Sequence, residues 1–135
     1  MTTFVADTHA MIWRAAARSR LGEGAREAFE RADRGEALVI VPAVVVAEMS
    51  MVAEKGRVPG WTPAALDALV REVTGSPNYR TTALTPDLVL ASRTLVAIPD
   101  IFDRLIAAEA LSLGATLVSR DAVFAGLVTT VWERA

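Results

Sequence analysis

The chain has 135 residues, 53% of them hydrophobic, and its 14 basic and 16 acidic side chains give a net charge of −2 at pH 7. This length predicts one domain with one hydrophobic core over residues 1–135, and the slightly acidic balance argues against a broad basic surface for nucleic acid without excluding a nuclease. Because the sequence has no cysteine, disulfides and thiolate metal sites are excluded, and any metal must be a hard ion held by oxygen, with His9 as an optional ligand.

Strand and helix patterns alternate along the chain. In order, we expect a strand at 2–6, a helical stretch through 11–13, an amphipathic helix at 25–34, a strand at 38–41, helices at 42–55 and 62–70, a strand at 79–84, a helix at 85–95, a helix that follows 99–100 and runs to 113, and strands at 115–119 and 129–132. Strands separated by helices predict an α/β fold, with a mainly parallel sheet covered by helices on both faces.

No apolar stretch of the sequence approaches the roughly 20 residues that span a bilayer. The first residues also lack a basic region followed by a hydrophobic core and a cleavage site. We therefore expect a cytoplasmic protein that does not interact with a membrane.

Four carboxylates stand beside apolar segments, where a folded chain would rarely leave them. Asp7 and Asp121 each follow a predicted strand, so both should lie at the edge of a parallel sheet where ligands bind. Asp103 lies in the first turn of its helix. Glu48 lies about two turns into a helix, and its neighbours three and four positions away are all apolar: Val44, Val45, Met51 and Val52.

If these four acids converge, they repel one another and lose hydration, which a divalent cation would relieve. Mg²⁺ or Mn²⁺ accepts carboxylate oxygens, polarises a phosphoryl group and lowers the pKa of water. Hydrolysis of a phosphodiester is the chemistry that fits this pattern best.

Each acid also has a purely structural interpretation. Asp7 could cap a helix after a turn, Asp100 could cap the helix that holds Asp103, and Asp121 could cap a short helix through 124. Neither a cap nor a turn explains Glu48, for which the structural alternative is a buried pair with an arginine.

Several segments resemble the successive motifs of PIN-domain proteins of the VapC toxin type. These are 5–9, Glu48 within its apolar helix, 84–87, 100–110 and 116–121, and the block at 100–110 is the most specific of them. The resemblance spans nearly the whole chain in the expected order. It implies a three-layer α/β/α sandwich and a Mg²⁺- or Mn²⁺-dependent endoribonuclease that acts as the toxin of a type II toxin–antitoxin system.

Residue roles follow from the same resemblance. Asp7, Glu48, Asp103 and Asp121 match the metal-binding and catalytic acids, Asp100 matches a position that is frequently acidic, and Thr8 matches a hydroxyl that supports the first acid. The implied partners are an RNA substrate, an antitoxin whose C-terminal segment covers the acidic groove, and a second copy in a homodimer. Candidates for contacts with RNA phosphates are Arg14, Arg18, Arg20, Arg104 and Arg120. Met11, Trp13, Met49, Met51 and Trp61 either pack in the core or contact these partners.

Two other functions remain open from the sequence. One is a PIN-fold protein without catalytic activity that sequesters an antitoxin. The other is an acidic signalling module of the receiver type, which would need a lysine late in the chain, whereas the only lysine is Lys55.

Overall fold

The computed structural model describes residues 1–133, and these form a five-stranded sheet at the centre of the protein. All neighbouring strands are parallel, in the order β3-β2-β1-β4-β5. The strands are β1 (Thr2–Ala6), β2 (Ala37–Pro42), β3 (Tyr79–Thr82), β4 (Thr116–Val118) and β5 (Thr130–Val131).

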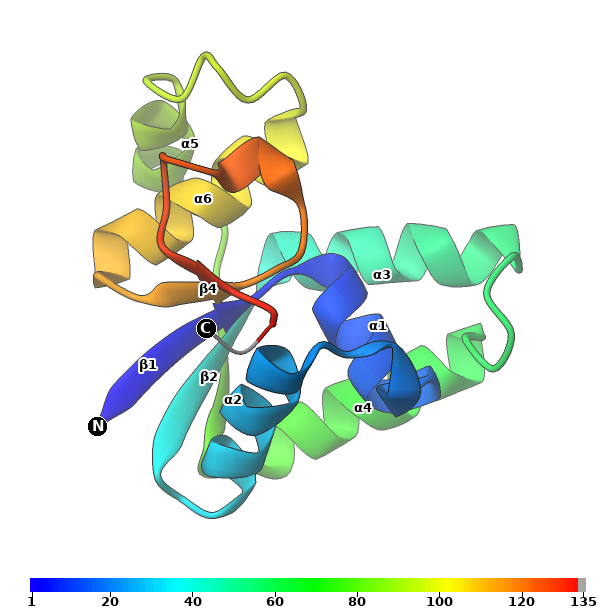
Figure 1. The fold of residues 1–135 in the computed structure, drawn as a ribbon. Coiled ribbons are helices and arrows are strands. Elements are labelled where there is room, and N and C mark those ends of the chain that lie inside the picture. The colour runs from blue at the N-terminus through cyan, green and yellow to red at the C-terminus, as the bar shows by residue number, and fades with distance from the viewer. Residues whose placement is uncertain (134–135) are drawn as a thin grey trace.

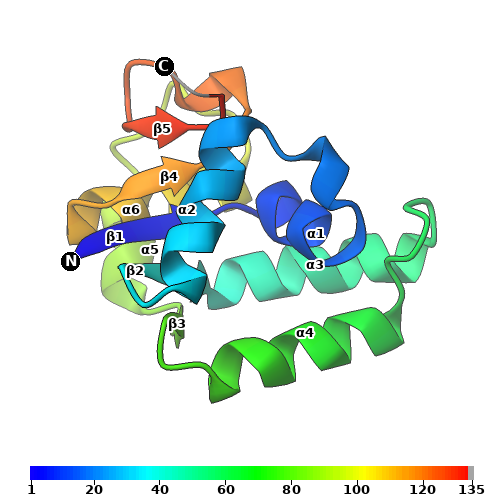
Figure 2. The ribbon, with the colours of Figure 1, turned by 60° about the horizontal axis from the view of Figure 1, so that its bottom comes forward.

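Helices cover both faces of this sheet. They are α1 (Thr8–Ala16), α2 (Glu23–Asp33), α3 (Ala43–Lys55), α4 (Pro63–Gly75), α5 (Pro86–Ser92) and α6 (Ile101–Leu113), with short 3-10 helices η1 (Arg18–Arg20) and η2 (Ala122–Phe124). In Figure 2, α2 crosses in front of β1 and β2, whereas α5 and α6 lie behind the sheet. Figure 1 shows α3 and α4 running side by side away from the strands. The predicted three-layer α/β/α arrangement is confirmed.

The inner strands are apolar over most of their length because both of their faces are covered. Val5, Val39, Leu117 and Val118 are all fully buried. Strands of parallel sheets read as continuous apolar runs for this reason, and it is why the sequence predicted these strands well. No helix within residues 1–133 is long and apolar enough to cross a bilayer.

Element boundaries differ from the prediction in a few places. Helix α4 continues to Gly75, past the expected end at Val70, because Val73 is buried and extends the apolar face of the helix by one turn. Strand β3 ends at Thr82 and α5 ends at Ser92, both earlier than expected. The short helix η2 after Asp121 is present, as one of the structural interpretations required.

The strand order decides between two of the functions left open by the sequence. From β1 the chain moves to β2 and β3 on one side, and then returns to place β4 and β5 on the other side of β1. A receiver domain has the order 2-1-3-4-5 instead, so the interpretation as a receiver-type module is wrong. The reversal puts the switch point between β1 and β4, where open α/β sheets bind ligands.

Candidate active site

A pocket of about 660 Å³ opens at the carboxyl ends of β1 and β4. It is lined by Asp7, Thr8, His9, Trp13, Arg20, Glu48, Asp100, Asp103, Ile106, Arg120, Asp121 and Ala122. The four acids singled out in the sequence therefore lie around one cavity, together with Asp100 and Thr8. These residues come from four separate segments of the chain, and only the fold brings them together.

Asp7 is placed by the end of β1 and the start of α1. Its backbone N–H donates to the carbonyl of Val118 at 3.2 Å, which continues the β1–β4 ladder, and its Oδ1 accepts from the N–H of Ala10 at 2.9 Å. The expected helix cap is thus present, and it uses one of the two carboxylate oxygens. Burial raises the pKa of Asp7, while hydrogen bonds from the Ser119 side chain and the Ala10 N–H oppose this shift.

Glu48 reaches the pocket from the second turn of α3. Its Oε1 accepts a hydrogen bond of 2.7 Å from Oγ1 of Thr8, whose own side chain is buried. Partial burial raises the pKa of Glu48 and the Thr8 bond opposes the rise, whereas the nearby charge of Asp100 adds to it. No arginine of residues 1–133 forms an ion pair with Glu48. The structural interpretation of Glu48 as one half of a buried ion pair is therefore wrong.

Asp103 is the carboxylate most strongly affected by the others. Burial raises its pKa to about 6, and the charges of Asp100, Glu48, Asp121 and Asp7 contribute in that order. Each of the other four acids thus lies near enough to disfavour the ionised form of Asp103.

Asp100 and Asp121 combine a cap with a position in the pocket. Asp100 accepts from the N–H groups of Phe102 at 2.8 Å and Asp103 at 3.2 Å, and so begins α6. Asp121 accepts from the N–H of Val123 at 3.0 Å and begins η2. These structural interpretations are correct, but a cap alone does not explain why both carboxylates line the cavity that holds Asp7, Glu48 and Asp103.

The donor chemistry fits a hard divalent cation, because the pocket offers carboxylate oxygens and no sulfur ligand. Among residues 1–133, however, no three acidic or histidine side chains stand in the geometry of a metal site. Asp7, Glu48, Asp100 and Asp121 each accept a hydrogen bond from a backbone N–H or a hydroxyl group instead. A bound metal therefore stays a prediction that the donor set favours.

Arg14 was predicted to contact RNA phosphates, and this prediction is wrong. Its side chain is only 6% exposed and donates to Glu72 at 2.8 Å and to the Tyr79 hydroxyl at 3.1 Å. The guanidinium also lies 4.7 Å from the centre of the Tyr79 ring. Arg14 thus links α1 to α4 and β3 in the interior, where no phosphate can reach it.

The other candidate arginines divide between the pocket and its surroundings. Arg104 is half-buried and donates to the carbonyl of Ile98, and neither it nor Arg18 lines the pocket. Arg20 and Arg120 do line it, and both are exposed.

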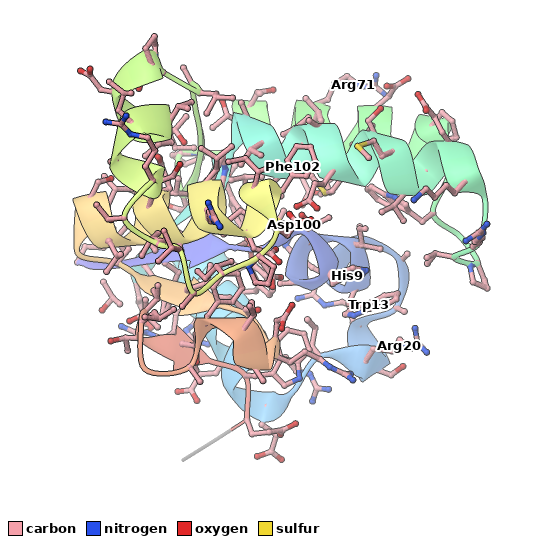
Figure 3. The ribbon with its side chains drawn as sticks, turned by 90° about the horizontal axis from the view of Figure 1, so that it is seen from above. His9, Trp13, Arg20, Arg71, Asp100 and Phe102 are labelled. Atoms are coloured by element: carbon pink, nitrogen blue, oxygen red, sulfur yellow. The ribbon has the colours of Figure 1, made fainter. Side chains whose placement is uncertain are left out.

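The sequence did not indicate that His9, Trp13 and Arg20 form one wall of this pocket. The ring centres of His9 and Trp13 are 5.7 Å apart, and the Arg20 guanidinium lies 4.5 Å from the Trp13 ring. Figure 3 shows Asp100, His9, Trp13 and Arg20 following one another from the start of α6 to the segment after α1. The four-residue spacing of His9 and Trp13 could have shown their common helix face, but the position of Arg20 depends on the turn that follows.

Comparison with known proteins gives results consistent with this geometry. Residues 4–127 match the model of a family described as PIN domain. Ribonuclease VapC22 of Mycobacterium tuberculosis is 34% identical over 126 residues, which cover 90% of this chain and 88% of the relative.

Solved structures share the fold at lower sequence identity. In the structure of VapBC2 from Rickettsia felis bound to a DNA fragment from its promoter, one chain superposes with a TM-score of 0.71 at 15% identity, covering 98% of this chain and all of the other. Mycobacterium tuberculosis VapC20, described as a toxin that cleaves the sarcin–ricin loop, gives 0.67 at 17% identity, covering 96% and 98% of the two chains.

Proposed function

The chain belongs to the PIN domain family, and we propose that it is a metal-dependent endoribonuclease that acts as the toxin of a toxin–antitoxin pair. The observation that carries the proposal is the convergence of five carboxylates from four separate segments around one pocket at the switch point of the sheet. The similarity of this chain, over 126 residues, to a protein named as a ribonuclease supports RNA as the substrate.

The acids of the pocket supply the oxygen donors that a hard cationic cofactor prefers. Asp7, Glu48, Asp103 and Asp121 would hold Mg²⁺ or Mn²⁺, with Asp100 adding negative charge beside them. Such an ion, when bound, supplies the Lewis acidity that activates a phosphodiester toward hydrolysis. The raised pKa of Asp103 supports this assignment, because burial and the four neighbouring carboxylates disfavour its ionised form and a positive charge would favour it.

The remaining residues of the pocket would position the ligands and the substrate. Thr8 fixes the carboxylate of Glu48 through its 2.7 Å hydrogen bond, so that Glu48 faces the cavity in one orientation. Arg120 stands at the exposed rim beside Asp121, where its guanidinium can hold an RNA phosphate and offset the repulsion between RNA and the acids.

A protein partner would regulate this site. We propose an antitoxin segment that carries basic side chains into the pocket, since five carboxylates attract positive charge. The complexes of toxins with antitoxins among the structurally similar proteins support this partner. Exposed apolar side chains at Leu84, Val89 and Leu90 offer a surface on which two copies could pair as a homodimer.

The direct test is the cleavage of RNA by the purified protein and its Asp7→Asn variant. Asparagine caps a helix as well as aspartate does, so D7N keeps the hydrogen bond to Ala10 and the fold while it removes the charge. We expect D7N to lose cleavage by at least about 100-fold, as is usual when a principal catalytic group is removed. Asp67→Asn, an exposed position of α4, is the matched control and should cleave at the parental rate.

Two results would contradict the proposal. One is that D7N and the parental protein cut RNA equally fast once a contaminating nuclease is excluded. The other is that calorimetry detects no binding of Mn²⁺ to the parental protein, which would favour the alternative of a PIN-fold protein that only sequesters an antitoxin.

A further inference from the structure

One wall of the pocket differs in chemistry from the rest. The acids come from the ends of β1 and β4, the second turn of α3 and the start of α6. The wall formed by His9, Trp13 and Arg20 carries two rings and a guanidinium group. Holding a cation and a phosphate requires no ring of this kind. The aromatic wall therefore indicates a second kind of contact with whatever enters the pocket.

We propose that this wall is a stacking platform, on which Trp13 and the plane of Arg20 hold one unpaired base of the RNA next to the phosphate that is cut. The inference rests on the ribonuclease function proposed above and adds a subsite to it. Unpaired bases in RNA are commonly held between aromatic side chains and arginine planes, because every base has a face that can stack.

The platform is open where a base would approach. Trp13 packs against the hydrophobic core with part of its side chain and lines the pocket with the rest, while His9 and Arg20 are exposed. The Arg20 guanidinium already lies 4.5 Å from the Trp13 ring, so a planar group is accommodated there. A base could extend this stack or replace Arg20 on the ring.

The platform is also held at a fixed distance from the acids. Asp7 caps the helix that carries Trp13, and their spacing of six positions corresponds to about 9 Å along a helix axis. Leu21, which follows η1 directly, is only 4% exposed and anchors the turn that brings Arg20 over Trp13. Trp13 is thus placed by a helix, and Arg20 by the anchored turn that follows it.

Charge favours RNA over a segment of a partner protein as the occupant of this wall. A basic segment drawn in by the carboxylates would meet the positive charge of Arg20, whereas a nucleotide presents a base to Trp13 and a phosphate to Arg20 or Arg120. RNA also needs attractive contacts to enter a pocket with five carboxylates, and stacking provides one that does not depend on charge.

An abasic scan of a short single-stranded RNA tests the platform. Bases are removed one at a time around the cleaved phosphate, and kcat/KM is measured for the parental protein, Trp13→Leu and Trp13→Phe. For the parental protein we expect removal of one base to lower kcat/KM by about 5- to 150-fold, the range that corresponds to the loss of one base–aromatic stack. On intact RNA, Trp13→Leu should lower kcat/KM by about the same factor. Removing the stacked base should lower kcat/KM of Trp13→Leu no further, and Trp13→Phe should restore part of kcat/KM on intact RNA.

Matched variants separate stacking from a structural role. Arg20→Ala should weaken RNA binding, whereas Arg57→Ala, at an exposed arginine outside the pocket, should not. Circular dichroism shows whether Trp13→Leu folds. If it does not, Trp13→Phe and Arg20→Ala still test whether removing the base lowers kcat/KM less in a variant of the platform than in the parental protein.

Three results would overturn the inference. In the first, the parental protein cuts RNA, but removing any one base changes kcat/KM by the same factor for Trp13→Leu as for the parental protein. The proposed function would then stand without the subsite. In the second, Trp13→Leu cleaves normally but loses binding of the antitoxin, and the wall belongs to a protein interface. In the third, the parental protein neither binds nor cuts RNA, and the proposed function fails together with the subsite.

Discussion

Thr8 donates a hydrogen bond of 2.7 Å to the carboxylate of Glu48, and this bond joins the first turn of α1 to the second turn of α3. The two residues are 40 positions apart in the sequence. Because Asp7 precedes Thr8 directly, the same contact fixes the distance between two of the acids of the pocket. The Thr8 hydroxyl thus acts on the geometry of the site without being one of its acids.

Thr8→Val should shift the pH dependence of RNA cleavage. The hydroxyl lowers the pKa of Glu48 against the effect of burial, so valine lets the pKa rise and moves the acidic limb of the rate profile to higher pH. Stability should fall by roughly 1 kcal/mol, less than for a fully buried bond to a charged group because Glu48 is partly exposed. Thr8→Ser keeps the hydroxyl and should keep the parental profile. Identical pH–rate profiles for Thr8→Val and the parental protein would show that the hydrogen bond does not change the pKa of Glu48.

Asp103→Asn should abolish cleavage and stabilise the metal-free protein at neutral pH. The pKa of Asp103 is about 6 in the folded state against 3.8 for an ordinary aspartate. Between these values the folded protein binds a proton that the unfolded chain has released, so this group makes stability fall as pH rises from about 4 to 6. Asparagine removes the effect, and we expect the Tm to rise by a few degrees at pH 7 and little below pH 4.

The matched control for this variant is Asp87→Asn, since Asp87 is an exposed residue in the first turn of α5, as Asp103 is in the first turn of α6. It should change neither cleavage nor the pH dependence of the Tm. A lower Tm for D103N at neutral pH would contradict the repulsion inferred for the pocket.

Divalent cations should stabilise the protein in a pH-dependent way. Binding requires ionised carboxylates, so protons compete with the metal at pH values near or below the pKa of Asp103. Thermal unfolding after treatment with a chelator should show a rise in Tm with Mg²⁺ or Mn²⁺ that is large at about pH 7.5 and small at about pH 5. A metal concentration 100 times the Kd should add about 2.7 kcal/mol. A shift of equal size in D103N would place the metal elsewhere.

Arg14→Met should destabilise the fold without changing the chemistry of the site. The variant loses the contacts of Arg14 with Glu72, Tyr79 and Asp33, and we expect a loss of about 2–3 kcal/mol, below the cost of breaking a fully buried pair because both acids stay partly hydrated. Denaturant unfolding measures this loss. Arg18→Met, at an exposed position, should be nearly neutral. Unchanged stability in R14M, with weaker RNA binding, would restore the original prediction for Arg14.

The sequence predicted the fold well because its signals were local. Apolar runs marked the buried strands, and Gly56 and Gly114 ended α3 and α6 in the left-handed conformation that glycine adopts without a steric cost. The ends of α4 and α5 were predicted less accurately because they depend on which side chains the rest of the chain buries. The role of Arg14 was predicted wrongly for the same reason, since an arginine in a helix gives no local sign that it will be buried.

By itself, the sequence determined the alternation of strands and helices and the set of acids that stand beside apolar segments, because both are properties of neighbouring residues. Only the tertiary structure decided the strand order, the meeting of Asp7, Glu48 and Asp103 in one pocket, and the position of Arg20 over Trp13. These features depend on contacts between segments far apart in the chain. Such contacts form when the sheet and its helices pack together, and no pattern within a single segment encodes them.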